Sequence, residues 1–76
     1  MTTVRIGASH ATNVQEVLDW LHHNVGEFHR RQLHTVTTRY FGEGWEAAWR
    51  QYGAGWFMDV MFDDPKYASF FTLRWK

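Results

Sequence analysis

The most constraining feature of this sequence is a short chain that contains no cysteine. A domain of 76 residues buries only about 60% of the surface that its unfolded form exposes, so its stability margin is thin. Disulfides, a structural metal or association with another chain usually compensate in small domains. The lack of cysteine excludes disulfides and thiolate zinc sites. Packing of apolar side chains, within or between chains, is therefore the main source of stability that we expect for the single domain 1–76.

The aromatic content supplies this apolar surface in excess. The chain has five tryptophans, three tyrosines and six phenylalanines, and each buried ring removes about 150–250 Å² from water. Because one small core is too small for all of them, we expect some rings at a dimer contact or a partner site. The alternative is that several rings lie half-buried at the edge of the core. We expect Trp45→Ala or Trp56→Ala to weaken assembly or folding.

Charge and hydropathy limit the classes of partner. The formal net charge is zero, which gives no overall case for nucleic-acid or membrane binding. No apolar run approaches the roughly 18 residues of a membrane span, and residues 1–10 lack the pattern of a signal peptide. We therefore expect a soluble, cytoplasmic protein. Charge is nevertheless uneven, because residues 20–39 have three arginines against one glutamate whereas 40–64 are rich in acidic residues.

The first clear element is a helix. A capping box at Thr12 or Asn13 predicts its start, and the apolar residues of 14–25 recur at the spacing of one helix face. Gly26 is a plausible end. The segment before this helix, residues 2–6, could form a short strand.

Strand patterns dominate the middle of the chain. Residues 27–34 have no convincing period and are predicted as a loop, whereas 35–41 alternate and are rich in β-branched and aromatic residues, which predicts a strand. Residues 45–52 fit either a strand or a helix, and their flanking glycines favour a strand. Residues 56–62 form the clearest strand, with the even-numbered apolar residues on one face.

The last element is predicted to be a helix that starts at Asp64 and Pro65, a capping side chain followed by a residue suited to the first turn. The sequence therefore predicts an α+β fold. It consists of an N-terminal helix, a three-stranded antiparallel meander and a C-terminal helix packed on one sheet face.

The histidine-rich stretch 22–34 does not indicate a metal site. His22 and His23 are adjacent and point about 100° apart on a helix, and an arginine pair separates His29 from His34. Charged imidazoles at a helix C-terminus interact favourably with its dipole instead. We predict no metal and no cofactor. A pH response based on histidine protonation is a further hypothesis.

No residue pattern indicates catalysis. The carboxylate pairs Asp63–Asp64 and Glu43–Glu46 have ordinary explanations, with Asp64 as a helix cap. No nucleophile setting and no phosphate-binding glycine pattern is present. We predict that the protein is not an enzyme.

A protein that works by binding another protein remains, either a distinct partner or a second copy in a homodimer. Tryptophan, tyrosine and arginine dominate binding energy at interfaces. The candidate partner-binding residues, with acidic Glu43, Glu46, Asp59 and Asp63 at their border, are Arg39, Trp45, Arg50, Phe57 and Met61.

Two alternatives stay open. One is a small nucleic-acid-binding accessory protein, in which Arg30, Arg31 and Arg39 contact phosphates and neighbouring aromatic rings stack on bases. The other is a self-assembling structural protein whose aromatic residues are buried between its copies.

The C-terminal half, with its "GWE" and "DDPKYASFFTLRW" segments, resembles small uncharacterised proteins of tailed bacteriophages. The resemblance implies no assigned activity and no catalytic residues. It implies a phage-encoded protein of the host cytoplasm and favours a role in binding and redirecting host proteins. The matching positions are Asp64, Pro65, Ala68, Phe70, Phe71, Leu73 and Trp75.

Overall fold

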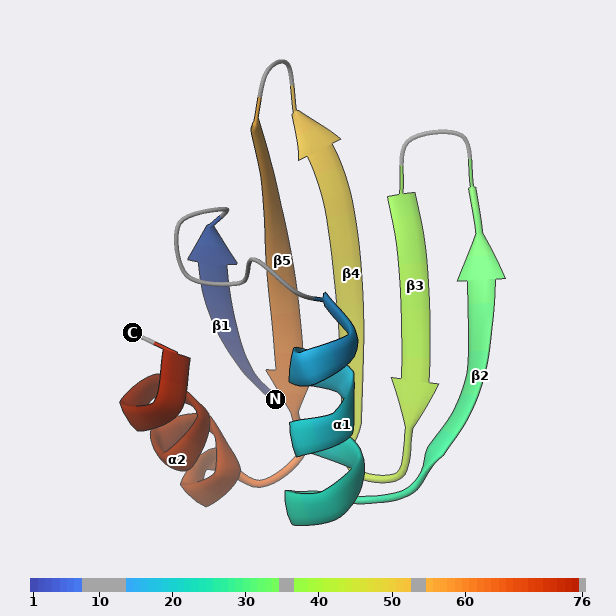
Figure 1. The fold of residues 1–76 in the computed structure, drawn as a ribbon. Coiled ribbons are helices and arrows are strands. Elements are labelled where there is room, and N and C mark those ends of the chain that lie inside the picture. The colour runs from blue at the N-terminus through green and yellow to red at the C-terminus, as the bar shows by residue number, and fades with distance from the viewer. Residues whose placement is uncertain (8–13, 35–36, 53–54, 76) are drawn as a thin grey trace.

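The computed structural model of this protein is built on one five-stranded antiparallel sheet with two helices on the same side of it (Figure 1). It describes residues 1–7, 14–34, 37–52 and 55–75. The strand order across the sheet is β1-β5-β4-β3-β2. Along the chain the elements are β1 (Thr2–Gly7), α1 (Val14–Asn24), β2 (Phe28–Leu33), β3 (Thr37–Gly42), β4 (Trp45–Tyr52), β5 (Gly55–Phe62) and α2 (Pro65–Trp75).

The predicted fold class, with an N-terminal helix and a three-stranded meander, is wrong. The sheet has two more strands than predicted, β1 and β2, one at each edge. The possible strand at the N-terminus exists as β1, precedes α1 and pairs with β5 from the other end of the chain. The predicted loop 27–34 contains β2. All its residues are exposed, so β2 lacks the apolar alternation that identifies a half-buried strand.

The remaining predicted elements are confirmed. Helix α1 and the strands β3, β4 and β5 form where the patterns placed them, and the ambiguous segment 45–52 is a strand. Helix α2 begins at Pro65, and the Asp64 carboxylate accepts a 3.0 Å hydrogen bond from the Lys66 amide. The predicted capping box at Thr12 or Asn13 lies outside the described residues.

The core fills the space between the helices and one sheet face. Alternation along β5 points Met58, Val60 and Phe62 toward α1 and α2, and all three are fully buried. The two helices also contact each other, through the rings of Trp20 and Phe71 with centroids 5.7 Å apart. The buried cluster is Val4, Ile6, Val17, Leu18, Leu21, Trp45, Ala47, Met58, Val60, Phe62, Ala68, Phe71 and Trp75.

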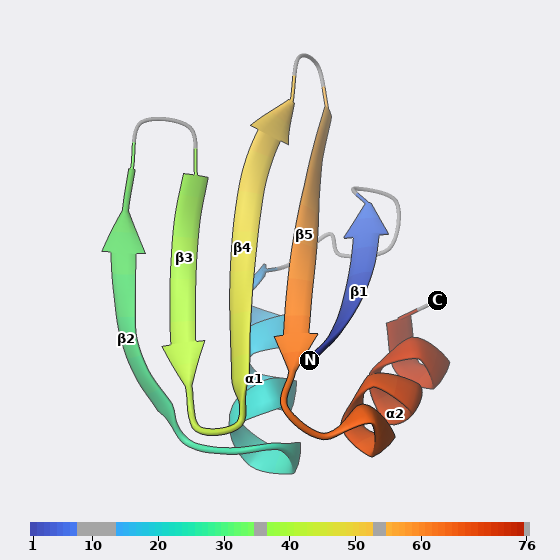
Figure 2. The same ribbon diagram turned by 180° about the vertical axis from the view of Figure 1, so that it is seen from behind.

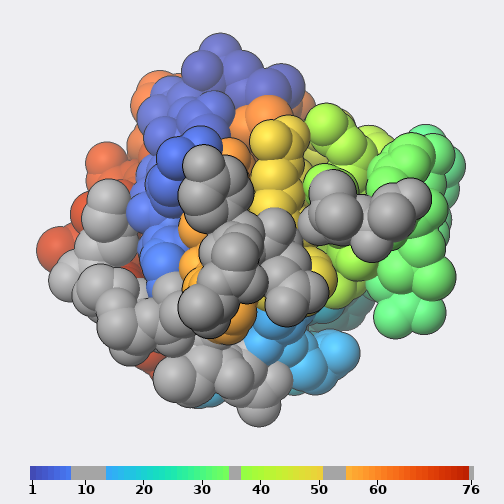
Figure 3. Space-filling model, turned by 90° about the horizontal axis from the view of Figure 1, so that it is seen from above, coloured from blue at the N-terminus to red at the C-terminus, as the bar shows by residue number. Residues whose placement is uncertain are grey.

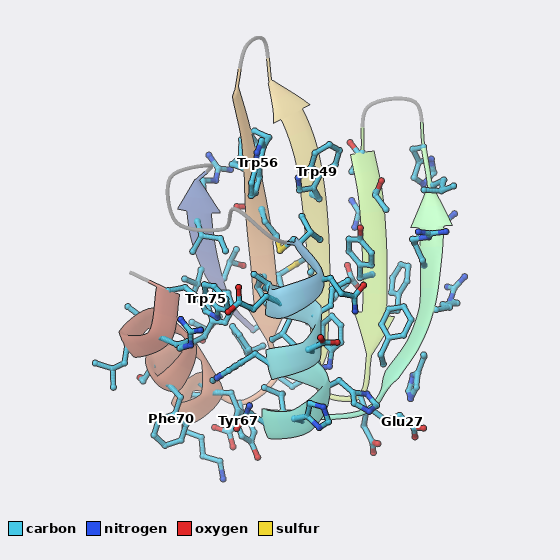
Figure 4. All side chains as sticks on the ribbon, in the orientation of Figure 1. Glu27, Trp49, Trp56, Tyr67, Phe70 and Trp75 are labelled. Atoms are coloured by element: carbon cyan, nitrogen blue, oxygen red, sulfur yellow. The ribbon has the colours of Figure 1, made fainter. Side chains whose placement is uncertain are left out.

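Most of the aromatic surplus is accommodated by this core and its edge. Trp49 and Trp56 lie side by side near one end of β4 and β5, with ring centroids 6.1 Å apart, and both are half-buried (Figure 4). The exposed aromatic side chains of the described residues are Phe28 and Phe70. The expectation of half-buried rings at the edge of the core therefore describes the molecule better than a large exposed aromatic patch.

Neither helix covers the whole sheet. Helix α1 lies in front of β4 and β5, and α2 lies beside β1, whereas β2 and β3 extend past the helices (Figures 1 and 2). Seen from above, β2 and α2 occupy opposite sides of the molecule (Figure 3). In the part of the chain that the structure describes, the sheet face that carries no helix and the region around β2 are therefore open for binding.

Candidate functional site

The sheet face opposite the helices, here called the helix-free face, is built from the alternate residues of all five strands (Figure 2). Residues that pair across neighbouring antiparallel strands point to the same side. The strand register therefore arranges this face in rows that run across the sheet. The rows are Arg30–Phe41–Glu46–Met61–Thr3, then Gln32–Arg39–Ala48–Asp59–Arg5, then Thr37–Arg50–Phe57–Gly7.

Two ion pairs hold part of this face in place. Arg5 pairs with Asp59, with 2.7 Å from Nε to Oδ1 and 3.2 Å from the second guanidinium nitrogen to Oδ2. The hydrogen bond to Asp59 and the charge of its carboxylate raise the pKa of Arg5. Arg39 Nη1 lies 3.1 Å from Glu46 Oε2. Ala48 lies between Arg39 and Asp59 in its row and is 3% exposed, so neighbouring side chains cover it.

Two further contacts place guanidinium groups over aromatic rings. Arg5 Cζ lies 4.2 Å from the centroid of the Phe57 ring, and Arg30 Cζ lies 4.5 Å from that of Phe41. Such cation–π contacts contribute about 0.5–1 kcal/mol at exposed sites. Both rings are half-buried. The helix-free face is thus a layer of half-buried apolar groups beneath ordered arginines.

Arginine exceeds carboxylate on this face. Among its described residues, four arginines (Arg5, Arg30, Arg39 and Arg50) share the face with two carboxylates (Glu46 and Asp59). Each carboxylate already pairs with one arginine. The face therefore has a positive charge surplus, although the whole chain is neutral.

The structure brings together four of the five predicted partner-binding residues, since Arg39, Arg50, Phe57 and Met61 all lie on the helix-free face. Trp45 does not share this face: it points to the opposite side, is 3% exposed and belongs to the core. Arg5 was missed, although the alternation of β1 around buried Val4 and Ile6 was a signal for it.

The acidic residues that were expected at the border behave in two ways. Glu46 and Asp59 lie inside the helix-free face and pair with arginines. Glu43 and Asp63 are exposed at the ends of strands. The two carboxylates on the face thus pair with Arg5 and Arg39. Arg50 pairs with no carboxylate in the described part of the chain.

The alternative nucleic-acid patch is divided between two faces. Arg31 pairs with Tyr40 in the register and points to the helix side, whereas Arg30 pairs with Phe41 and points to the helix-free side. Arg39 shares the side of Arg30 because Gln32 is its partner. Strand geometry thus separates Arg31 from Arg30 and Arg39.

On the helix side, α1 and the strands β2 and β3 enclose a groove of about 540 Å³. Burial raises the pKa of the Tyr40 hydroxyl there, and the nearby charge of Arg31 opposes this effect. His22 Nδ1 accepts a 2.9 Å hydrogen bond from the Phe28 amide, which fixes the connection from α1 to β2. The groove is lined by Gln15, Leu18, Asp19, His22, Phe28, Arg31 and Tyr40.

The histidines that the structure describes do not assemble into a metal-binding set. His22 and His23 occupy the last turn of α1, as predicted, while His29 lies in β2. Within the described ranges, no three histidine, aspartate or glutamate side chains group together as metal ligands. No described helix is long and apolar enough to cross a membrane.

Comparisons of the chain with protein-family models, with curated proteins and with solved structures gave no match. The resemblance of the C-terminal half to small phage proteins therefore stays a prediction.

Proposed function

We propose that this protein is a small, non-catalytic binding protein that recognises another protein through its helix-free face. The observation that carries this proposal is the placement of arginine, phenylalanine and methionine side chains on one sheet face that no described element covers. Arginine and aromatic residues dominate binding energy at protein interfaces, and methionine is enriched there. Side chains that are already ordered by ion pairs and ring contacts also lose little entropy on binding.

The contacts of the rings favour a protein over a nucleic acid. Bases stack on exposed aromatic faces, but guanidinium groups already lie over Phe57 and Phe41. The carboxylates of Glu46 and Asp59 sit among the arginines and would repel phosphates. A protein surface tolerates this mixture, because its own side chains can supply both signs of charge.

The charge surplus favours a distinct partner over a second copy. Face-to-face dimerisation would combine eight arginines with four carboxylates, twice the composition of one face. An acidic surface on the partner would instead pair with Arg50 and relieve the surplus. A homodimer and a nucleic-acid complex remain as alternative outcomes of the test.

The test is affinity capture from host lysate with a charge reversal on the face. Arg50→Glu is the test variant, because Arg50 is exposed and central to its row. Lys66→Glu is the matched control, since Lys66 is exposed on α2. We expect one protein to be retained after nuclease treatment by the native chain and by Lys66→Glu, and to be lost with Arg50→Glu.

Three results would contradict the proposal. Equal retention by both variants would remove the helix-free face as the binding surface. Recovery of nucleic acid with steep salt dependence would favour phosphate contacts. A dimeric mass for the purified chain that becomes monomeric with Arg50→Glu would assign the face to self-association.

A further inference from the structure

The outer edge of β2 is the second surface that the fold leaves open. β2 is the last strand of the sheet, and no strand in the described part of the chain pairs with its outer side. It lies at the side of the molecule away from α2 (Figures 1 and 3). Every residue from Phe28 to Leu33 is exposed. Such an edge presents backbone donors and acceptors to any extended segment that comes alongside.

The register identifies which backbone groups point outward. The His34 amide donates a 2.8 Å hydrogen bond to the Thr37 carbonyl oxygen. His34 and Thr37 are therefore a hydrogen-bonded pair of the ladder between β2 and β3. Hydrogen-bonded and non-bonded pairs alternate along an antiparallel ladder. The N–H and C=O groups of Leu33 and Arg31 therefore point away from β3, toward the unpaired edge. They have the spacing that an added strand requires.

The side chains of β2 give this edge a chemical preference. Arg30 points to the helix-free side and Arg31 to the groove side. Phe28 and Leu33 add exposed apolar surface on the groove side, with Leu33 66% exposed. No carboxylate occurs in residues 28–34. The side chains of β2 itself are therefore positive on both faces of the sheet and apolar at the two ends of the strand, while Asp19 of α1 lines the same groove as Arg31.

We propose that the β2 edge binds an extended acidic segment of a partner protein as a sixth strand of the sheet. Consecutive residues of a strand point to opposite faces, so two adjacent carboxylates would meet Arg30 on one face and Arg31 on the other. Of the two residues that flank the acidic pair, one points to the groove side, where an apolar side chain would contact the exposed ring of Phe28. This mode of recognition combines main-chain hydrogen bonds with side-chain specificity.

Charge argues against a second copy of this chain as the added strand. Pairing β2 with β2 of another copy would bring four arginines together without a carboxylate in residues 28–34 of either chain. Like charges on neighbouring strands destabilise the pairing. Positive edges also protect natural sheets against aggregation, and the experiment below separates that protective role from binding.

The experiment titrates isotope-labelled protein with the peptide acetyl-Thr-Val-Glu-Glu-Val-Thr-amide and follows backbone amide signals by NMR. We expect saturable shifts centred on Arg31 and Leu33. The same peptide with lysines in place of the glutamates, and a version with N-methylated valines, should bind about tenfold more weakly or not at all, because they lose charge or hydrogen-bond complementarity.

Two variants test the strand geometry. Leu33→Pro removes an outward N–H and no bond to β3, so it should abolish peptide binding with the fold retained. Arg31→Glu should weaken binding about tenfold, as a repulsion replaces an attraction. Arg50→Glu, on the helix-free face, should leave peptide affinity unchanged, which separates this site from the proposed function.

The inference is overturned by any of three outcomes. The acidic peptide leaves the β2 signals unmoved, the lysine peptide binds as well, or Leu33→Pro binds with native affinity while its spectrum shows the native fold. The first outcome would leave the arginines with a protective role only. The third would replace strand addition with simple charge attraction.

Discussion

The indole Nε1 of Trp45 donates a 2.7 Å hydrogen bond to the carbonyl oxygen of Gly26, 19 residues earlier in the chain. This contact joins the end of α1 to the first residue of β4. The Trp45 ring also stacks on Phe28 at the start of β2, with centroids 6.2 Å apart. One side chain therefore connects the core to the base of the groove and to the exposed strand β2.

Replacement of Trp45 should destabilise the protein strongly. We expect Trp45→Ala to lower the free energy of unfolding by about 3–5 kcal/mol, as for other large buried aromatics. Trp45→Phe should lose less, including about 0.5–1.5 kcal/mol for the hydrogen bond. Urea denaturation measures both, with the half-buried Trp56→Phe as a milder comparison. A loss below about 1 kcal/mol for Trp45→Ala would contradict this role.

Gly26 is required for the close approach of two loops. A Cβ at this position would collide with the backbone carbonyl of Glu43. The amide of Glu43 donates a 2.9 Å hydrogen bond to the carbonyl oxygen of Glu27. We expect Gly26→Ala to cost about 1–3 kcal/mol, as overpacking does elsewhere. Gly7→Ala is the control, because no atom of the described residues lies within 4 Å of a Cβ there. Equal melting temperatures for the two variants would refute the close approach.

The cap of α2 should be measurable in isolation. Asp64 Oδ1 accepts a hydrogen bond from the Lys66 amide, so Asp64→Ala should destabilise the protein by about 1 kcal/mol. The neighbouring, exposed Asp63 provides the control, and Asp63→Ala should change stability by less than about 0.5 kcal/mol. If the two substitutions have the same effect in thermal unfolding, the cap contributes nothing.

Tyr40 predicts a loss of stability in alkali. Burial raises the pKa of its hydroxyl in the folded protein, so the fold favours the neutral phenol. The contribution of the neutral phenol to the free energy of unfolding is complete below the unfolded pKa of about 10. It is lost as pH rises through the folded pKa. Unfolding free energies measured across this range should fall less steeply for Tyr40→Phe than for the native chain. Parallel curves would show that Tyr40 does not contribute.

Local periodicity was sufficient for much of the fold and insufficient for its sheet. The helices and β5 are each buried on one side, and one-sided burial produces the periodic order of apolar residues from which they were predicted. β2 has both faces exposed, so it has no such order, and only its pairing with β3 makes it a strand. The pairing of β1 with β5 joins opposite ends of the chain, which no local pattern specifies.

The candidate site was predictable to the extent that alternation defines it. Arg50 and Trp45 are an odd number of residues apart on β4, so they point to opposite faces. The same rule could have removed Trp45 from the predicted set and separated Arg30 from Arg31. The ion pair of Arg5 with Asp59 depends on the register between β1 and β5, and it required the structure.

The most direct test of protein binding by the helix-free face is photo-cross-linking from two matched positions. Benzoylphenylalanine replaces Phe57, which is half-buried on that face, or Phe70, which is 54% exposed on the outer side of α2 (Figure 4). After irradiation in a cell lysate, we predict a single protein adduct from position 57 and none from position 70. An adduct from position 70 alone, or only nucleic acid or a second copy of this chain at position 57, would contradict the account.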